Sequence, residues 1–200
     1  MTRLGLLISA LAIWIFAGAP ALAISTVVID AGHGGHDRGG VSGQRYAEKI
    51  YTLDVAKRLS SCLRQAGYRT VMTRSGDYFV SLDQRCGIAN RQLSAIFVSV
   101  HFNAAPRRDA NGIETYYYGR ASSGLAASVH RRVVAAAGTE NRGVRRRSFY
   151  VIRNTRCPAI LVECGFLSSA GGEGGRIARS SSHRQRLAEA IARGIASRYR

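Results

Sequence analysis

The sequence predicts a single α/β domain with a mostly parallel, twisted sheet and helices on both faces. Short apolar runs rich in β-branched residues alternate with longer segments that carry apolar residues at helical spacing. The 200 residues suit one domain, and 46% hydrophobic residues are enough to form a core, which argues against a disordered binding tail. No internal repeat and no linker to a second domain is apparent.

Five strands are expected where short apolar runs are bounded by turn residues. They cover residues 24–30, 68–73, 95–100, 113–118 and 158–163. The run AIFVSV at residues 95–100 is almost wholly apolar, which is typical of a strand covered on both faces.

Four helices are expected between and after these strands, at residues 47–66, 82–93, 123–137 and about 184–197. In the first, apolar residues including Leu53, Leu59 and Leu63 recur on one face, and Gly67 follows as a helix-ending residue. In the last, Leu187 and Ile191 share a face in the same way.

Residues 1–23 are predicted to be a signal peptide. Arg3 precedes a long apolar run that ends in Ala21-Leu22-Ala23, the small-x-small pattern of a cleavage site. Cleavage after Ala23 would release residues 24–200 into the periplasm or the outer cell wall. An uncleaved membrane anchor is the alternative, because the apolar run is close to the length that spans a bilayer.

The chain is strongly basic, with 29 Lys and Arg residues against 12 Asp and Glu residues and a net charge of +17. Such a charge attracts polyanions. An exported protein meets anionic cell-wall polymers and lipid headgroups, so we expect wall polymers rather than nucleic acid as partners. The alternative is that the charge reflects a generally basic composition without a tethering role.

Four cysteines are present, at Cys62, Cys86, Cys157 and Cys164. Disulfides are permitted in an exported chain, but three pairings are possible and the sequence does not choose among them. No C-x-x-C spacing occurs, so a cysteine-based zinc site is not expected. Buried free thiols remain the alternative to one or two disulfides.

Four polar side chains are expected at one edge of the sheet. His33, His101 and Glu163 come at the carboxyl ends of three predicted strands, where ligands bind in open α/β sheets. Glu48 lies in the first turn of the first helix, and helical side chains lean toward the N-terminus, which tilts it to the same edge.

Two imidazoles and a carboxylate are a common ligand set for catalytic zinc and leave a fourth position for water. A further carboxylate nearby can move a proton from that water to a leaving amine. This set therefore suits amide hydrolysis. Each residue taken singly also has a structural interpretation, such as a hydrogen-bonded histidine or a carboxylate paired with arginine, so the residues alone indicate only a possible metal site.

Four segments, VVIDAGHGG, AEKIYTLDVAKRL, FVSVHFNA and CPAILVECGFLSS, occur in this order along the chain. In order and spacing they resemble the zinc-dependent N-acetylmuramoyl-L-alanine amidases of the AmiA/AmiC and sporulation-amidase type. TRSGDYFVSLDQRCGIAN and NRGVRRRSFYVIRNT extend the resemblance, which runs from about residue 27 to residue 196.

The resemblance implies that residues 24–200 form an amidase catalytic domain. It implies that His33, Glu48 and His101 bind one Zn²⁺ ion and that Glu163 is the catalytic acid and base. The implied substrate is peptidoglycan, cut at the amide between N-acetylmuramic acid and the L-alanine of the stem peptide.

Some relatives carry an inhibitory helix between the second histidine and the final glutamate. Residues 102–162 look too short for it, so we expect no obligatory activator. We also expect a monomer. Cys164 departs from the family pattern beside Glu163 and, as a free thiol, could compete for metal.

The three other histidines are expected to lie outside the metal site. His36 stands at a variable position of the family pattern, and His130 and His183 are predicted on helix surfaces.

Two other functions are compatible with part of the sequence. A non-catalytic cell-wall-binding protein with an amidase-like fold would keep the architecture, but the retained Glu163 argues against it. A basic nucleic-acid-binding domain would show basic and aromatic residues interleaved, which occurs only weakly around residues 116–118 and 145–147.

Overall fold

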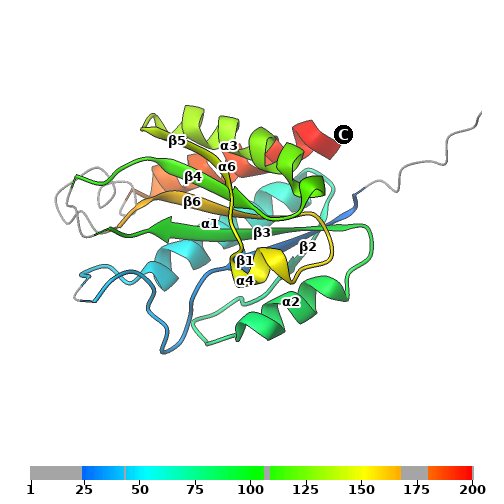
Figure 1. Ribbon diagram of the computed structural model, residues 1–200, viewed down its shortest axis with the longest axis horizontal. Coiled ribbons are helices and arrows are strands. Elements are labelled where there is room, and N and C mark those ends of the chain that lie inside the picture. Colours follow the sequence, from blue (N-terminus) through cyan, green and yellow to red (C-terminus); the bar gives the residue numbers. More distant parts are fainter. Residues whose placement is uncertain (1–23, 43, 106–108, 168–179, 200) are drawn as a thin grey trace, which may run out of the picture.

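The computed structural model describes residues 24–42, 44–105, 109–167 and 180–199. In this part of the chain, six strands form one sheet in the order β2-β1-β3-β6-β4-β5, with helices on both faces (Figure 1). The predicted single α/β domain is confirmed. The predicted signal peptide lies outside the described residues, and none of the helices within them is long and apolar enough to cross a membrane.

Four strands run parallel, and their carboxyl ends meet at one edge of the sheet. They are β1 (Thr26–Ala31), β2 (Arg69–Met72), β3 (Ala95–Asn103) and β6 (Ala159–Phe166). Each matches a predicted strand to within a few residues. We call the edge where β1, β3 and β6 end the carboxyl edge.

The remaining two strands run the other way. β4 (Ile113–Tyr117) pairs antiparallel with β6, and β5 (Asn141–Arg146) pairs parallel with β4. The first residues of β4 and β5 therefore lie at the carboxyl edge. β5 was not expected, because its sequence NRGVRR is polar, but arginines suit an outermost strand, where charge discourages pairing with other chains.

Helices α1 (Glu48–Gln65), α3 (Ser123–Ala137) and α6 (Ser181–Tyr199) pack on one face of the sheet around a large apolar core. α2 (Leu82–Asn90) and the short α4 (Tyr150–Arg153) pack on the other face around a smaller core. A single 3-10 turn, Arg120–Ser122, precedes α3. We call the face under α2 and α4 the second face. His101 and Glu163 lie on it, because Phe97 and Leu161, at even spacing from them along β3 and β6, belong to the smaller core.

α2 ends earlier than predicted. Ser81 caps its start through a reciprocal pair of hydrogen bonds with Gln84, as in a capping box. The helix ends at Asn90, and Leu93, expected inside it, is 86% exposed.

The prediction of surface positions for His130 and His183 is wrong, since both are buried. Their helices were correctly predicted, but the sequence did not show which face each imidazole occupies. His130 hydrogen-bonds Thr115 of β4 at 3.0 Å and Asn141 of β5 at 2.7 Å, so it joins α3 to the two antiparallel strands.

All four cysteines lie among the described residues, and all four are free thiols. Cys86 and Cys164 are buried, while Cys62 and Cys157 are half-buried. Burial raises the pKa of the Cys157 thiol to about 11, so this thiol is protonated at neutral pH. The cysteines thus serve as small apolar residues in this structure.

A buried ion pair lies under the carboxyl edge. The Asp30 carboxylate of β1 accepts hydrogen bonds from Arg85 at 2.7 Å, Thr73 at 2.7 Å and Ser99 at 2.6 Å. Arg85 also donates to the carbonyls of Ala31 at 2.7 Å and His33 at 2.8 Å. This network fixes the backbone where β1 turns toward His33.

Burial alone would raise the pKa of Asp30, but the Arg85 guanidinium and the hydroxyl hydrogen bonds lower it on balance. The ionised carboxylate therefore stabilises the fold at pH values above 3.8, its ordinary pKa. This contribution is lost as the pH falls through the lowered pKa of the folded state.

We expect Asp30→Asn to lower the free energy of unfolding at pH 7 by about 3–5 kcal/mol, because it leaves the Arg85 charge buried without its partner. Urea unfolding at pH 7 and at acid pH measures the effect, and the difference from the wild type should narrow at acid pH. Asp54→Asn is the matched control. Asp54 forms partly exposed ion pairs with Arg58 and Arg184, so its loss should cost less than about 1 kcal/mol. Equal losses in the two variants would contradict this account.

Candidate metal centre

His33 is held by an unusual backbone turn directly after β1. Its φ angle is 62°, in the left-handed region that side chains other than glycine rarely adopt. Arg74 and Arg85 hold this turn from below: Arg74 donates to the carbonyl of Gly32 at 2.8 Å, and Arg85 donates to that of His33 at 2.8 Å. These two buried arginines offset the local strain and aim the imidazole toward the carboxyl edge.

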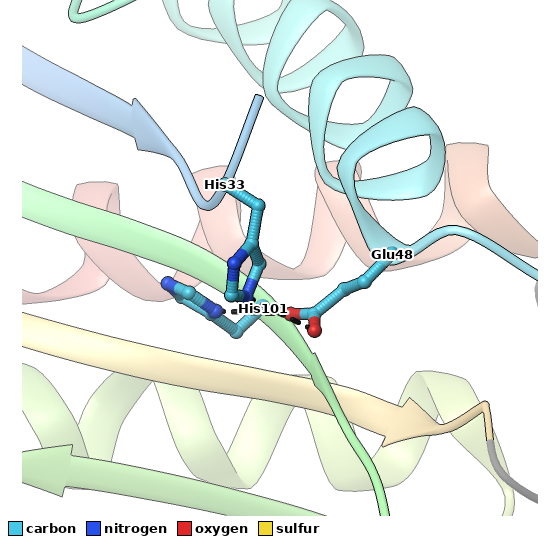
Figure 2. Close-up of side chains that lie close together, drawn as sticks. All are labelled: His33, Glu48 and His101. Carbon is cyan, nitrogen blue, oxygen red and sulfur yellow. Dashed lines mark hydrogen bonds and ion pairs between the residues drawn. The ribbon is translucent and has the colours of Figure 1, made fainter. Parts of the chain in front are cut away.

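The three predicted ligands come together at this edge. His33 follows β1, Glu48 is the first residue of α1, and His101 lies near the end of β3 (Figure 2). Glu48 Oε2 lies 3.0 Å from His33 Nε2, and Glu48 Oε1 lies 2.9 Å from His101 Nδ1. One ligand atom from each residue falls within 4.8 Å of the others, so this group has the size to hold a metal ion.

Glu48 is the buried centre of this group, with an exposed fraction of 3%. Its carboxylate also accepts hydrogen bonds from the backbone N–H groups of Phe102 at 2.9 Å and Gly40 at 3.1 Å. Burial would raise the pKa of Glu48, but the hydrogen bonds from the two imidazoles lower it to about 2. The group is therefore anionic at neutral pH, as a metal-binding carboxylate must be.

Asp37 orients His33 from the opposite side of the ring. Its Oδ2 atom lies 2.8 Å from His33 Nδ1. Burial lowers the pKa of His33, but the hydrogen bonds to Glu48 and Asp37 raise it on balance. A carboxylate on one ring nitrogen is the usual support for a histidine that binds metal through the other nitrogen, which leaves Nε2 as the ligand atom.

Two glycines leave room for the imidazoles. A Cβ atom on Gly32 would lie 2.3 Å from His101 Cε1, and one on Gly39 would lie 2.6 Å from both Glu48 Oε2 and His33 Cδ2. Gly39 also has a φ angle of +67°. Glycine at these two positions therefore makes space for the ligand side chains themselves.

Glu163 lies on β6 next to the metal-binding group. In the sheet register it pairs with His101 of β3 on one side and with Glu114 of β4 on the other. Paired residues of neighbouring strands project to the same face, so the three side chains form a row across the carboxyl edge. Figure 1 shows these strands as neighbours in the middle of the sheet.

The carboxyl group of Glu163 has an oxygen without a hydrogen-bond partner. Its Oε2 atom is buried and has no such partner among the described residues. Burial raises the pKa of Glu163 well above its ordinary value, and the nearby charges of Glu48 and Glu114 add to this effect. A carboxyl group with a raised pKa can both accept and release a proton close to neutral pH.

Cys164 does not compete for a metal ion at this site. It follows Glu163 directly, and successive residues of a strand point to opposite faces. Its side chain packs in the core beneath α1, α3 and α6, away from the row of polar residues. The Cys164 thiol is free, but its place in the core keeps it from competing for a metal ion.

An open cavity of about 670 Å³ adjoins His33 on the loop side. It is lined by His33, His36, Asp37, Arg38, Gly39, Gly40, Val41, Ser42 and Gln44. His36 belongs to this lining and lies against the Phe79 ring, with centroids 4.3 Å apart, and it is not part of the metal-binding group.

Sequence reasoning missed two members of this site. Asp37 stands four residues after His33 in a loop. Its nearness in sequence to a predicted ligand is the only signal that could have indicated it, and that signal is weak. Glu114 gave no signal, because only the antiparallel pairing of β4 with β6 brings its strand start to the carboxyl edge.

The donor set fits zinc better than magnesium or calcium. Two imidazole nitrogens and one buried carboxylate are typical zinc ligands, while the other two ions prefer oxygen. The support of His33 by Asp37 and the anionic state of Glu48 agree with this choice.

We expect Gly32→Ala to lower zinc affinity by at least about tenfold, because the new methyl group displaces the His101 ring. Gly32 has no positive φ angle, so the substitution tests contact rather than backbone strain. Calorimetric titration with zinc measures the affinity, and circular dichroism checks the fold. Gly87→Ala is the control, since its Cβ would lie an ordinary 3.5 Å from Arg91. Wild-type affinity in Gly32→Ala would contradict the packing described here.

Comparison with known proteins identifies the family of this chain. Residues 27–197 match the family described as N-acetylmuramoyl-L-alanine amidase. The chain is 37% identical over 179 residues to the N-acetylmuramoyl-L-alanine amidase LytC of Bacillus subtilis. The matched region covers 88% of this chain but only 36% of LytC.

Two solved structures are similar over most of the fold. The catalytic domain of the amidase CwlV from Bacillus (Paenibacillus) polymyxa var. colistinus has a TM-score of 0.81 and 39% identity, covering 86% of this chain and 97% of CwlV. The amidase AmiC2 of Nostoc punctiforme has a TM-score of 0.79 and 41% identity, covering 86% of this chain and 95% of AmiC2. The chain therefore belongs to the N-acetylmuramoyl-L-alanine amidase family.

Proposed function

We propose that this protein is a zinc-dependent hydrolase of peptidoglycan. It cuts the amide that joins the lactyl group of N-acetylmuramic acid to the L-alanine of the stem peptide. The single observation that carries the proposal is the buried Glu48 carboxylate between two imidazoles, beside the buried and unpartnered Oε2 atom of Glu163. Family membership indicates which bond is cut, and the geometry of the site supports metal-assisted hydrolysis of that bond.

His33, Glu48 and His101 are the residues that hold the metal in this proposal. Zinc bound there supplies a Lewis acid that acidifies a water molecule and polarises the scissile carbonyl. Asp37 keeps the His33 ring in the required tautomer through Nδ1. The backbone N–H groups of Phe102 and Gly40 keep the Glu48 carboxylate in place.

Glu163 moves the proton. Its carboxylate accepts a proton from the attacking water and then donates it to the leaving alanine nitrogen, so one group serves as base and acid. Its raised pKa suits both steps, because the protonated and ionised forms are then closer in free energy near neutral pH. The unpartnered Oε2 atom leaves an acceptor for the water.

The expected export to the cell wall fits this activity. The basic surface then holds the enzyme on anionic wall polymers, and the enzyme acts as a monomer. We also expect activity without an activator. Of the described helices between β3 and β6, α3 lies on the opposite face of the sheet, and α4 precedes the start of β6, away from the carboxyl edge (Figure 1). Neither of these helices covers the metal-binding group.

We expect Glu163→Gln to lower kcat on purified peptidoglycan by about 10²–10⁴-fold, because it removes the proton acceptor while keeping the shape. Zinc affinity should stay unchanged, since Glu163 is not a ligand. Glu189→Gln, on the exposed face of α6, is the control and should keep full activity. Mass spectrometry of the products should find free peptides that begin with L-alanine. Glycan fragments or cut cross-links instead would contradict the proposed bond.

We expect chelation of the metal to abolish hydrolysis and zinc to restore it. The fold should persist, because Glu48 is already hydrogen-bonded to both imidazoles in the structure and neither apolar core includes these residues. Turbidity loss of peptidoglycan and circular dichroism are measured on the same samples. Binding of peptidoglycan without clearing, at any zinc concentration, would favour the non-catalytic wall-binding protein.

A further inference from the structure

The guanidinium of Arg142, on the outermost strand β5, makes only long polar contacts. Its Nε atom lies 3.5 Å from Glu114 Oε1, while Nη1 lies 3.4 Å from both the Asn111 carbonyl and Glu140 Oε1. Hydrogen bonds from arginine to carboxylates are commonly about 2.7–2.9 Å long. The Nε atom is buried and has no hydrogen-bond partner in the part of the chain that the structure describes. The Arg142 guanidinium therefore lies close to Glu114 but forms no short hydrogen bond with it.

Apolar packing holds Arg142 in this position. Its guanidinium carbon lies 5.1 Å from the centre of the Phe166 ring, a cation–π contact. Its aliphatic stem lies against Gly112, where a Cβ atom would be 2.7 Å from both Cγ and Cδ. The side chain is 31% exposed, so solvent and ligands can reach it.

A second arginine adds positive charge beside it. Arg145 Nε lies 3.8 Å from Glu114 Oε1, and its guanidinium also donates to the backbone carbonyl of Arg142. Glu114 already accepts shorter hydrogen bonds from Asn103 at 2.9 Å and Tyr116 at 2.7 Å. Asn103 and Tyr116 are thus closer to the Glu114 carboxylate than the two arginines are. Arg142 and Arg145 can therefore bind another anion as well.

The order of the strands gives the direction of the substrate. His33, His101, Glu163 and Glu114 lie on or directly after β1, β3, β6 and β4, which are successive neighbours in the sheet. In the proposed reaction Glu163 contacts the leaving nitrogen, so the stem peptide departs on the side of β4 and β5. The sugar then lies toward the loop cavity beside His33.

Distances along this direction match the length of a peptide. Neighbouring strands lie about 4.8 Å apart, so β5 is about 10 Å from β6. The residue after L-alanine ends about 7 Å from the leaving nitrogen in an extended chain. The Arg142 side chain, directed toward Glu114, spans the remainder.

We infer that Arg142, supported by Arg145, binds a free α-carboxylate on the stem-peptide residue that follows L-alanine. The enzyme then prefers stem peptides with a free acid at this residue over those carrying the carboxamide. This inference rests on the proposed function, because it uses Glu163 to orient the peptide.

The test uses two soluble N-acetylmuramoyl tripeptides in which the second residue is joined to the third through its side-chain carboxyl group. They differ only at the α-carboxyl group of that second residue, which is free in one and amidated in the other, and the C-terminus of each is amidated. For the wild type we expect kcat/KM to be about tenfold to a hundredfold higher on the free acid, the value of a charged hydrogen bond. Arg142→Gln should lose this preference by slowing the free acid alone. Binding of each substrate to Glu163→Gln, with and without Arg142→Gln, should show the same difference in affinity.

Arg146→Gln is the matched control, since it removes the same charge from the same strand. Its guanidinium donates to the Tyr118 carbonyl at 3.0 Å and stacks on that ring, away from Glu114. It should keep the wild-type preference. An equal loss on both substrates in Arg142→Gln, or no preference in the wild type, would overturn the inference while leaving the amidase function standing. Hydrolysis of neither substrate or of peptidoglycan by the wild type would instead refute the proposed function.

Discussion

The buried negative charge of the Glu48 side chain holds together the group of residues at the carboxyl edge of the sheet. Its carboxylate contacts the imidazoles of His33 and His101, so it joins the loop after β1, the start of α1 and the end of β3. An anion at 3% exposure is costly unless it is paired. The two imidazoles, two backbone N–H groups and the start of a helix together meet that cost. A metal ion between the same groups would meet it more completely, which is why this arrangement suits zinc.

Buried side chains under the carboxyl edge hold its backbone in place. The Asp30–Arg85 ion pair and Arg74 bind the carbonyls of the turn that carries His33, and this turn has a strained φ angle. Burial of two arginines under the sheet edge is therefore linked to function as well as to stability. Side chains on a rigid sheet edge are positioned more accurately than those on a free loop, and catalysis by positioned groups depends on such accuracy.

The row of polar residues on the second face of the sheet has different neighbours at its two ends. At one end of the row of polar residues lie the proposed metal ligands and the loop cavity, and at the other lie Glu114 and the arginines of β5. Glu163 stands between them. In the proposed function, this order puts the sugar and the peptide of the substrate on opposite sides of the Glu163 carboxyl group. The reversed direction of β4 and β5 makes this possible, because it brings the starts of two strands to the edge where the others end.

The sequence by itself determined the α/β class, the positions of five strands and four helices, and the three residues that the structure brings within metal-binding distance. Local patterns carry that information, because apolar periodicity and short motifs are properties of neighbouring residues. Only the tertiary structure decided the direction of β4, the existence of β5 and the burial of His130 and His183. It also decided the free state of the cysteines, the pairing of Glu114 with Glu163 and the nearness of Arg142 to Glu114. Strand pairing and the packing of helix faces join residues that are distant in sequence, and no local pattern records which distant residues meet.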